Sequence, residues 1–251
     1  MLLSVHVPCC STRCRYCAFH SIPLGRGVDA ATSPVVRDYV DTLFLELAHW
    51  GDELGGSEVQ TVFFGGGTPS LLSPRIIGLT MERISKYFKL APKAEVTLEA
   101  NPESLRGGHR AAQYLDAGIN RLSIGVQSMD EGMLRLLGRP HKAQDSLHVA
   151  FLAREAGCAN INLDLMWGLP GQSVRQWLQT LKDVLPMAPN HISAYGLTLE
   201  PGTPIELDVE EGRLTLPPER DHNIMFMEGA AMLEQHGYLH YEISNFARMG
   251  F

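Results

Sequence analysis

The stretch Leu2-Leu3-Ser4-Val5-His6-Val7-Pro8-Cys9-Cys10-Ser11-Thr12-Arg13-Cys14-Arg15-Tyr16-Cys17 joins a short apolar run to four of the chain's five cysteines. The run Leu2–Val7 has the length and composition of a buried parallel strand. Cys10, Cys14 and Cys17 follow it with the spacing C-x₃-C-x₂-C, which puts three thiols on one loop. In a reducing compartment, such crowding indicates metal binding rather than disulfides.

Three thiolates can bind three corners of a cubane iron–sulfur cluster and leave the fourth iron open to a ligand. A structural zinc site normally has four protein ligands. The cluster is therefore favoured, and zinc with His6 or His20 as the fourth ligand stays as the alternative. Cys9 is expected to be a buried small hydrophobe rather than a competing ligand, and Cys158 to be structural.

Beyond the cysteines, apolar runs of four to eight residues alternate with longer segments of helical period. The expected strands are Leu2–Val7, Val59–Phe64, Ala94–Glu99, Arg121–Val126, Ile161–Trp167 and His191–Leu197. The expected helices are Pro34–Trp50, Pro74–Phe88, Leu105–Ala117, Gln144–Ala156 and Val174–Leu185, with glycine stops at Gly51, Gly118 and Gly157. This alternation predicts an α/β fold with a parallel sheet, either open and doubly wound or closed, fully or partly, into a barrel.

The pattern changes near Glu200, where several prolines interrupt the alternation. A helix over Glu219–His236 and a short strand over Tyr241–Ser244 are expected after them. We therefore expect one domain over residues 1–199, with the cysteine loop at 10–17. Residues 200–251 are expected to be the start of a C-terminal appendage that is cut short.

Composition excludes several classes of protein. The chain is 45% hydrophobic and 20% charged with a formal net charge of −7, which is ordinary for a globular domain, and no Lys/Arg run offers an extended basic face for phosphates. Nucleic acid is therefore not expected as a partner. No apolar stretch is long enough to span a bilayer, and the N-terminus lacks the basic start of a signal peptide. A cytoplasmic location is expected.

Polar residues follow several of the expected strands. The turn Gly65–Gly67 follows one of them, and Glu99, Gln127 and Asp164 stand at or just past the ends of three others. Because ligand sites in parallel α/β folds gather at the carboxyl edge of the sheet, these residues are candidates for one site.

The cysteine loop, with Tyr16 as the aromatic before its last cysteine, resembles that of the radical S-adenosylmethionine (SAM) superfamily. Further segments resemble the group of that superfamily that contains oxygen-independent coproporphyrinogen III oxidase and the heme chaperone HemW. These segments are Val5–Pro8, Phe64–Ser70, Leu98–Pro102, Arg121–Ser128, Leu137–His141, Leu163–Gly171, His191–Tyr195, Leu199–Thr203 and Tyr241–Ala247. The resemblance runs through the whole chain in order.

The resemblance implies a partial (β/α)6 TIM-like radical SAM barrel. It also implies a [4Fe–4S] cluster on Cys10, Cys14 and Cys17, with the open iron chelated by the amino and carboxylate groups of SAM. In this superfamily, electron transfer from the cluster splits the S–C5′ bond of SAM and yields a 5′-deoxyadenosyl radical.

The resemblance further implies a set of SAM-binding residues: Tyr16, Gly66, Gly67, Thr68, Glu99, Gln127, Arg139 and Asp164. The glycines would let the backbone approach the methionine moiety where a Cβ would clash, and Thr68 would add a hydroxyl. One of the two carboxylates would anchor the SAM ammonium or the ribose hydroxyls. Gln127 and Arg139 would contact the adenosyl part or a second SAM. The alternative for Glu99 and Asp164 is a solubilising charge at a strand end, and for Arg139 it is a charge at a helix end. His6 is expected to support the cluster loop, and no residue is assigned as catalytic.

Within the group, the chain resembles most the HemW branch, which binds heme and passes it to acceptor proteins. The alternative is the porphyrinogen oxidase, an enzyme that decarboxylates propionates. That branch has an N-terminal extension and a further cysteine two residues after the third ligand, where this chain has Phe19. Two positions depart from the family pattern: Ser4 replaces a tyrosine that contacts SAM, and Cys9 replaces a phenylalanine. The expected ligands are thus SAM and either heme or porphyrinogen, with a heme-acceptor protein as partner.

Overall fold

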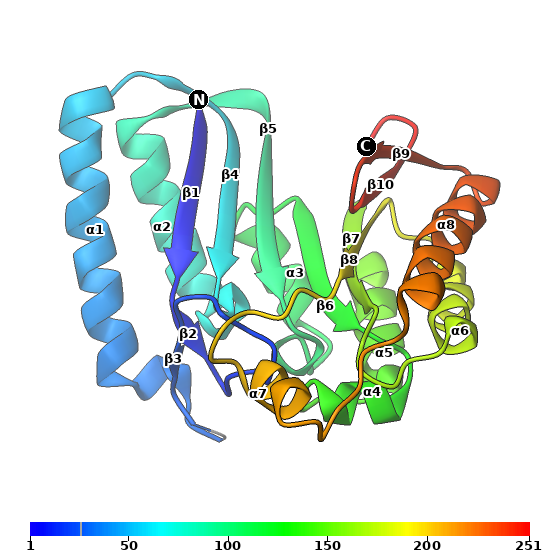
Figure 1. The fold of residues 1–251 in the computed structure, drawn as a ribbon. Helices are drawn as coiled ribbons and strands as arrows, with labels where there is room; N and C mark the ends of the chain where they lie inside the picture. The colour runs from blue at the N-terminus through cyan, green and yellow to red at the C-terminus, as the bar shows by residue number, and fades with distance from the viewer. Residues whose placement is uncertain (26) are drawn as a thin grey trace. The chain divides into compact units, whose positions relative to one another are not determined.

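The computed structural model describes residues 1–25 and 27–251, and these form two compact units. The first unit comprises Met1–Arg13, Phe19–Leu122 and Leu152–Ala159. The second comprises Cys14–Ala18, Ser123–Phe151 and Asn160–Phe251. Parallel strands alternate with helices in both units, so the predicted α/β class is confirmed (Figure 1).

The first unit is built on a parallel sheet in which β4 pairs with β1 on one side and β5 on the other. Its strands are β1 (Leu2–Val7), β2 (Cys9–Cys10), β3 (Ile22–Pro23), β4 (Glu58–Gly66) and β5 (Lys89–Ala100). Its helices are α1 (Pro34–Leu54), α2 (Pro74–Tyr87) and α3 (Arg110–Asp116), with 3₁₀ turns at Ala30–Thr32, Pro69–Leu71 and Pro102–Ser104. Strand β6 (Arg121–Gln127) and helix α5 (Ala143–Glu155) each have residues in both units.

In the second unit, β7 and β8 pair in parallel, and β10 adds antiparallel to β8 and carries β9 beyond it. The strands are β7 (Asn160–Trp167), β8 (His191–Gly196), β9 (Tyr238–Glu242) and β10 (Asn245–Arg248). The helices are α4 (Glu131–Leu136), α6 (Val174–Val184), α7 (Pro204–Glu210) and α8 (Glu219–Gln235), with a 3₁₀ turn at Leu185–Met187. The predicted domain boundary at residues 199 and 200 stays a prediction.

Helices α1 and α2 lie side by side in the first unit (Figure 1). Gly51 was expected to end α1, but the helix continues to Leu54, so that expectation is wrong. A Cβ at Gly51 would stand 2.5 Å from Tyr87 Cδ1, so a glycine at this position within α1 lets the Tyr87 ring pack against the helix. Gly118 and Gly157 do follow helices with positive φ, as predicted.

In the second unit, α6 and α8 lie side by side (Figure 1) and share a buried tryptophan. The indole Nε1–H of Trp177 donates to the Met225 carbonyl at 2.9 Å. This satisfies the one polar atom of a ring that is otherwise surrounded by apolar side chains, among them Leu233.

Two other expectations about element bounds are wrong. The helix expected from Leu105 begins only at Arg110, because Gly107 and Gly108 interrupt it. The strand expected at Tyr241–Ser244 ends two residues early: Tyr241 and Glu242 are the last residues of β9, and Ile243 and Ser244 form the turn before β10 begins at Asn245. The Glu242 carboxylate accepts from the Ser244 N–H at 2.9 Å and so stabilises this turn. No helix among the described residues is long and apolar enough to cross a membrane.

Candidate functional site

In the first unit, the glycine-rich turn after β4 holds the segment that carries Cys10. The Gly67 N–H donates to the Val7 carbonyl and the Thr68 N–H to the Cys9 carbonyl, both at 2.8 Å. The hydroxyl of Thr68 donates to Cys10 Sγ at 3.6 Å. The turn therefore fixes the backbone before Cys10 and supplies a hydrogen bond to its sulfur.

Residues at the end of β5 and just after it form hydrogen bonds with that turn. The Gly66 N–H donates to Glu99 Oε2 at 3.1 Å, and the Asn101 amide donates to Thr68 Oγ1 at 3.0 Å. Because the Thr68 hydroxyl accepts from Asn101, its own hydrogen is left to point at Cys10. Asn101 was quoted in the sequence as part of a motif, but no role was predicted for it.

Gly66 and Gly67 cannot carry side chains in this turn. Gly66 has φ +111°, and a Cβ there would stand 2.7 Å from the His6 ring. A Cβ at Gly67 would stand 2.7 Å from the Cys9 carbonyl oxygen and 3.0 Å from Cys10 Sγ. The close approach that the sequence predicted for these glycines is thus made here to the chain's own cysteine segment.

In the second unit, Cys14 and Cys17 belong to one turn, in which the Cys17 N–H donates to the Cys14 carbonyl at 3.3 Å. Arg15 secures the turn. Its N–H donates to the Leu137 carbonyl at 3.0 Å, its carbonyl accepts from Ile205, and its guanidinium pairs with Asp208. Arg15 was not predicted as a site residue. The signal that could have found it is the place of this cationic residue between Cys14 and Cys17.

Arg139 contacts the same turn. Its Nη1 donates to Cys14 Sγ at 3.5 Å and its Nη2 donates to the Gly125 carbonyl at 2.8 Å. The guanidinium is therefore aimed at the sulfur by a backbone acceptor at the end of β6, and it places a positive charge beside the thiol.

Tyr16 packs its ring against a buried apolar cluster of Leu137, Met166, Leu169 and Ile205. Burial raises the pKa of the Tyr16 hydroxyl above its ordinary value, against the opposing effect of Arg139. The ring anchors the turn between Cys14 and Cys17 to the core of the second unit.

Gln127 ends β6 in a strained conformation. Its φ is +65°, and the Ser128 N–H donates to the Val126 carbonyl at 2.8 Å, which closes a three-residue turn around it. A non-glycine residue in such a turn is uncommon and costs free energy, and strain of this kind clusters at functional sites. The position agrees with its predicted place at the carboxyl edge of a strand.

Asp164 lies inside β7, three residues before its end, and not at a strand end as predicted, and two side chains from the same unit hold it there. Ser123 Oγ donates to Asp164 Oδ2 at 3.0 Å, and the Asn162 amide donates to Asp164 Oδ1 at 2.8 Å. The carboxylate is therefore ordered rather than free in solvent. Ser123 and Asn162 were missed at the sequence level, although polar residues inside apolar strands are a signal that could have found them.

The remaining candidates lie as follows. Cys9 and Cys158 are buried, as expected, and burial together with the neighbouring Cys10 raises the pKa of the Cys9 thiol. His6 lies beside Gly66 and its Nε2 contacts the His20 carbonyl at 3.2 Å, which joins both ends of the cysteine segment.

The thiols suit an iron–sulfur cluster in their chemistry. None of the five cysteines is in a disulfide, and Cys10 and Cys14 each accept a side-chain hydrogen bond at sulfur. Such hydrogen bonds stabilise thiolates and tune clusters. Within residues 1–25 and 27–251, no three Cys, His, Asp or Glu side chains are arranged to hold a single metal ion.

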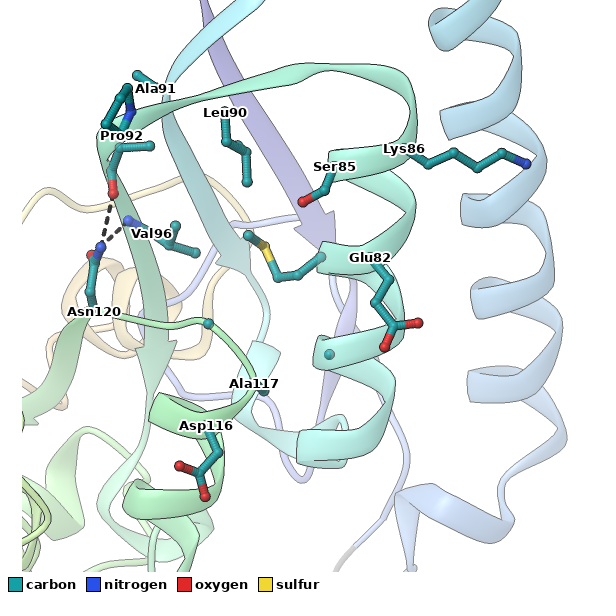
Figure 2. Close-up of a pocket in the computed structure, with 14 residues that line it drawn as sticks. Glu82, Ser85, Lys86, Leu90, Ala91, Pro92, Val96, Asp116, Ala117 and Asn120 are labelled. Atoms are coloured by element: carbon teal, nitrogen blue, oxygen red, sulfur yellow. Dashed lines mark hydrogen bonds between the residues drawn. The ribbon is translucent and has the colours of Figure 1, made fainter.

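A cleft of about 730 Å³ opens elsewhere in the first unit, between α2 and the start of β5 (Figure 2). The pairing of β4 and β5 shifts between Val59 and Thr61, so residues 91–94 bulge out of the ladder. Asn120 closes the bulge through hydrogen bonds to Val96 N and Ala94 O, both at 2.8 Å. The cleft lies at the amino end of β5, whereas Glu99 lies at its carboxyl end, so this cleft is not the predicted site.

The first strand of this α/β chain leads to Cys10, Cys14 and Cys17, and a hydroxyl donor contacts the sulfur of Cys10 while a guanidinium donor contacts that of Cys14. The model of the radical SAM superfamily matches residues 4–184. The chain belongs to the radical SAM superfamily.

Curated relatives and a solved structure agree with this membership. The chain is 42% identical over 248 residues to the mitochondrial radical S-adenosyl methionine domain-containing protein 1 of Bos taurus, covering 99% of the chain and 54% of that protein. It is 38% identical to heme chaperone HemW of Escherichia coli, covering 99% and 63%. The structure of coproporphyrinogen III oxidase (HemN) from E. coli is 28% identical with a TM-score of 0.86, covering 100% of this chain and 56% of that one. The chain thus spans about half to three fifths of the length of these proteins.

Proposed function

We propose that the chain binds a [4Fe–4S] cluster through Cys10, Cys14 and Cys17 and SAM at the iron that these thiolates leave open. The observation that carries the proposal is the pair of hydrogen bonds from Thr68 to Cys10 and from Arg139 to Cys14. Donors aimed at sulfur favour thiolate over thiol, and thiolate is the form that binds iron. When bound, the cluster supplies the electron that cleaves SAM.

The SAM molecule would lie against residues in the carboxyl-terminal halves of the strands and in the turns that follow them. The Gly66–Thr68 turn offers backbone that can approach a ligand, and Glu99 and Asp164 offer carboxylates for an ammonium or for ribose hydroxyls. The strained turn at Gln127 fits a residue placed for a ligand. Tyr16 would complete the set from the cysteine turn, and Arg139 from the segment between α4 and α5.

We further propose that the protein handles heme for delivery to an acceptor protein, in the manner of the HemW relatives. The support is similarity along the whole chain to proteins named as heme chaperones in several bacteria. The fold match to HemN favours porphyrinogen oxidation as the second candidate. Phe19 occupies the position at which that branch has a further cysteine, and this argues against the oxidase.

One anaerobic experiment separates these functions. The chain is reconstituted with iron and sulfide and mixed with SAM, a strong reductant and coproporphyrinogen III. A chromatogram then measures 5′-deoxyadenosine and decarboxylated porphyrin, and a parallel titration follows heme by its absorption spectrum. Cys14→Ala tests the ligand set, and Cys158→Ala is the matched control because Cys158 is a buried cysteine outside the loop.

The expected result is deoxyadenosine without porphyrin product, saturable heme binding, and loss of iron in Cys14→Ala but not in Cys158→Ala. Decarboxylated product would replace the heme proposal with the oxidase. Failure of the wild-type chain to retain iron and sulfide would overturn the cluster proposal, and with it the SAM proposal.

A further inference from the structure

Polar side chains form a stripe across the otherwise apolar sheet of the second unit. Side chains two residues apart on a strand share a face, and the register pairs Asn162 with His191, Asp164 with Ser193, and Ser193 with Asn245. The stripe consists of Ser123 on β6, Asn162 and Asp164 on β7, His191 and Ser193 on β8, and Asn245 on β10. Asn162 is only 2% exposed and His191 only 7%, so these groups were taken out of water on folding.

Burial of so many polar atoms is costly unless each finds a partner. At one end, Asn162 Nδ2 donates to both Asp164 Oδ1 (2.8 Å) and Ser123 Oγ (2.7 Å). The Ser123 hydroxyl passes its own hydrogen to Asp164 Oδ2. Both carboxylate oxygens of Asp164 are thereby addressed by donors that are themselves fixed.

The carboxylate determines which way the Asn162 amide faces. If the amide were turned over, its oxygen would lie against the Asp164 carboxylate, so the nitrogen must point to Asp164 and Oδ1 to the other side. Asn162 Oδ1 lies 2.7 Å from His191 Nδ1, and an amide oxygen can only accept. His191 therefore carries a hydrogen on Nδ1. In the neutral ring, Nε2 is then an acceptor, and the Tyr241 hydroxyl lies 2.8 Å from it.

The far end of this chain of hydrogen bonds is the β9–β10 hairpin. Tyr241 stands at the end of β9, and its ring meets His191 edge-on. Ser193 Oγ donates to Asn245 Oδ1 at 2.9 Å, and the Asn245 amide donates to Glu242 Oε2 at 2.7 Å. The motif Tyr241-Glu242-Ile243-Ser244-Asn245, for which no role was predicted, is thus attached to β8 by two side-chain hydrogen bonds.

We propose that Asn162, His191 and Tyr241 are positioning residues that fix the Asp164 carboxylate for SAM. They act in series, with Tyr241 orienting His191, His191 orienting Asn162, and Asn162 orienting Asp164. None of the three touches the reacting atoms. The inference rests on the proposed role of Asp164 in SAM binding and adds the residues behind it.

Substitutions at His191 test the series in the reconstituted protein, with the dissociation constant of SAM measured by equilibrium dialysis. His191→Leu removes the donor to Asn162 and is expected to weaken SAM binding about tenfold, the effect of losing an ordered hydrogen bond to a charged group. His191→Gln restores an N–H donor and is expected to recover affinity to within about threefold of wild type. Recovery by Gln would not follow from a purely structural role.

A pair of tyrosines on β9 provides the matched comparison. Tyr241→Phe removes the hydroxyl from His191 and is expected to weaken SAM binding about threefold. Tyr238→Phe removes a buried hydroxyl that donates to the Pro189 carbonyl at 2.7 Å, outside the series, and is expected to leave SAM affinity unchanged. Equal SAM affinities in the two variants, or in His191→Leu and wild type, would overturn the proposal.

The tautomer of His191 tests the proposed series of hydrogen bonds without a measurement of SAM binding. Proton–nitrogen correlation NMR of the imidazole rings, with the His191 signals assigned by their loss in His191→Gln, is expected to show a hydrogen on Nδ1 and an unprotonated Nε2. A hydrogen on Nε2 alone would overturn the series whatever SAM does. A wild-type chain that shows the expected tautomer but binds no SAM would instead overturn the proposed function, and the positioning role toward SAM with it.

Discussion

Thr68 shows how a single hydroxyl serves the predicted cluster. The Thr68 hydroxyl accepts a hydrogen bond from the Asn101 amide and donates one to Cys10 Sγ, so the hydroxyl hydrogen is oriented toward the sulfur. Thr68→Val keeps the shape of the side chain and removes this donor. Because hydrogen bonds to sulfur favour the reduced, more negative cluster, we expect its reduction potential to fall by about 60 mV. This corresponds to a tenfold change in a one-electron equilibrium.

Spectroscopic redox titration of the reconstituted protein measures this shift. Thr68→Ser is the control, since it keeps the hydroxyl and should stay within about 20 mV of wild type on the same scale. A potential unchanged in Thr68→Val would mean that the Thr68 hydroxyl does not act on the cluster and serves the turn alone.

Asp130 acts at the start of α4, where its Oδ1 accepts from the N–H groups of Gly132 (2.7 Å) and Met133 (3.0 Å). Partial burial favours the neutral acid, but the Gln176 amide and these two backbone donors outweigh it and hold the pKa of Asp130 below its ordinary value. Asp130→Ala should lower the free energy of unfolding by about 1 kcal/mol at pH 7, the usual cost of a lost N-cap.

The pH dependence of that difference follows from the direction of the shift. A carboxyl whose pKa is depressed in the folded state contributes stability above its unfolded pKa, about 3.9. The contribution is lost as the pH falls through the folded value. Urea unfolding of wild type and Asp130→Ala should therefore show a gap that is full at pH 7 and narrows below about pH 4. A gap that stays constant into acid would show that the charge of Asp130 does not matter to the cap.

At the scale of elements, the contact of α6 with α8 depends on a glycine. A Cβ at Gly229 would stand 2.6 Å from Trp177 Nε1, and the Trp177 ring is held by its hydrogen bond to Met225. Gly→Ala inside a helix normally stabilises by up to about 1 kcal/mol. Here we expect Gly229→Ala to destabilise the protein by about 1–3 kcal/mol because the rigid ring cannot move aside.

Gly78 in α2 is the matched control for this substitution. The nearest atom to a Cβ there is Ala117 Cβ at 3.7 Å, an ordinary contact. Gly78→Ala should therefore stabilise the protein while Gly229→Ala destabilises it, and urea unfolding of both variants gives the two signs. The same sign for both would mean that helix propensity, and not the contact with Trp177, dominates at Gly229.

For the whole molecule, the sequence predicts what depends on local pattern. Apolar runs locate the strands, and Gly118 and Gly157 locate helix ends. The ligand set of Cys10, Cys14 and Cys17 stays a prediction. The failures depend on neighbours that are distant in sequence. Gly51 reads as a helix stop because the sequence does not show the Tyr87 ring that needs the space.

The same reason explains what was missed at the candidate site. Ser123 and Asn162 interrupt apolar strands, but their meaning appears only when the strand register sets them beside Asp164 and His191. The sequence of a strand shows which of its residues share a face of the sheet. It does not show which residues of the neighbouring strands will lie beside them. The sequence can therefore point to a residue that stands in a recognisable motif. It cannot show which side chains will form hydrogen bonds with that residue and orient it.

The coupling of ligand binding to unfolding tests the proposed cofactors at this scale. A ligand that binds only the folded state stabilises it by RT ln(1 + [L]/Kd), where [L] is the free ligand concentration, so SAM at one hundred times its dissociation constant should add about 2.7 kcal/mol. For a chain of this size, that corresponds to a rise in Tm of about 5–10 °C. We expect this rise in the reconstituted protein and not in the iron-free chain, because the proposed anchor of SAM is the open iron. Thermal unfolding monitored by anaerobic circular dichroism measures the Tm of both forms. An equal rise in the iron-free chain would place SAM binding in the polypeptide alone and contradict that anchor.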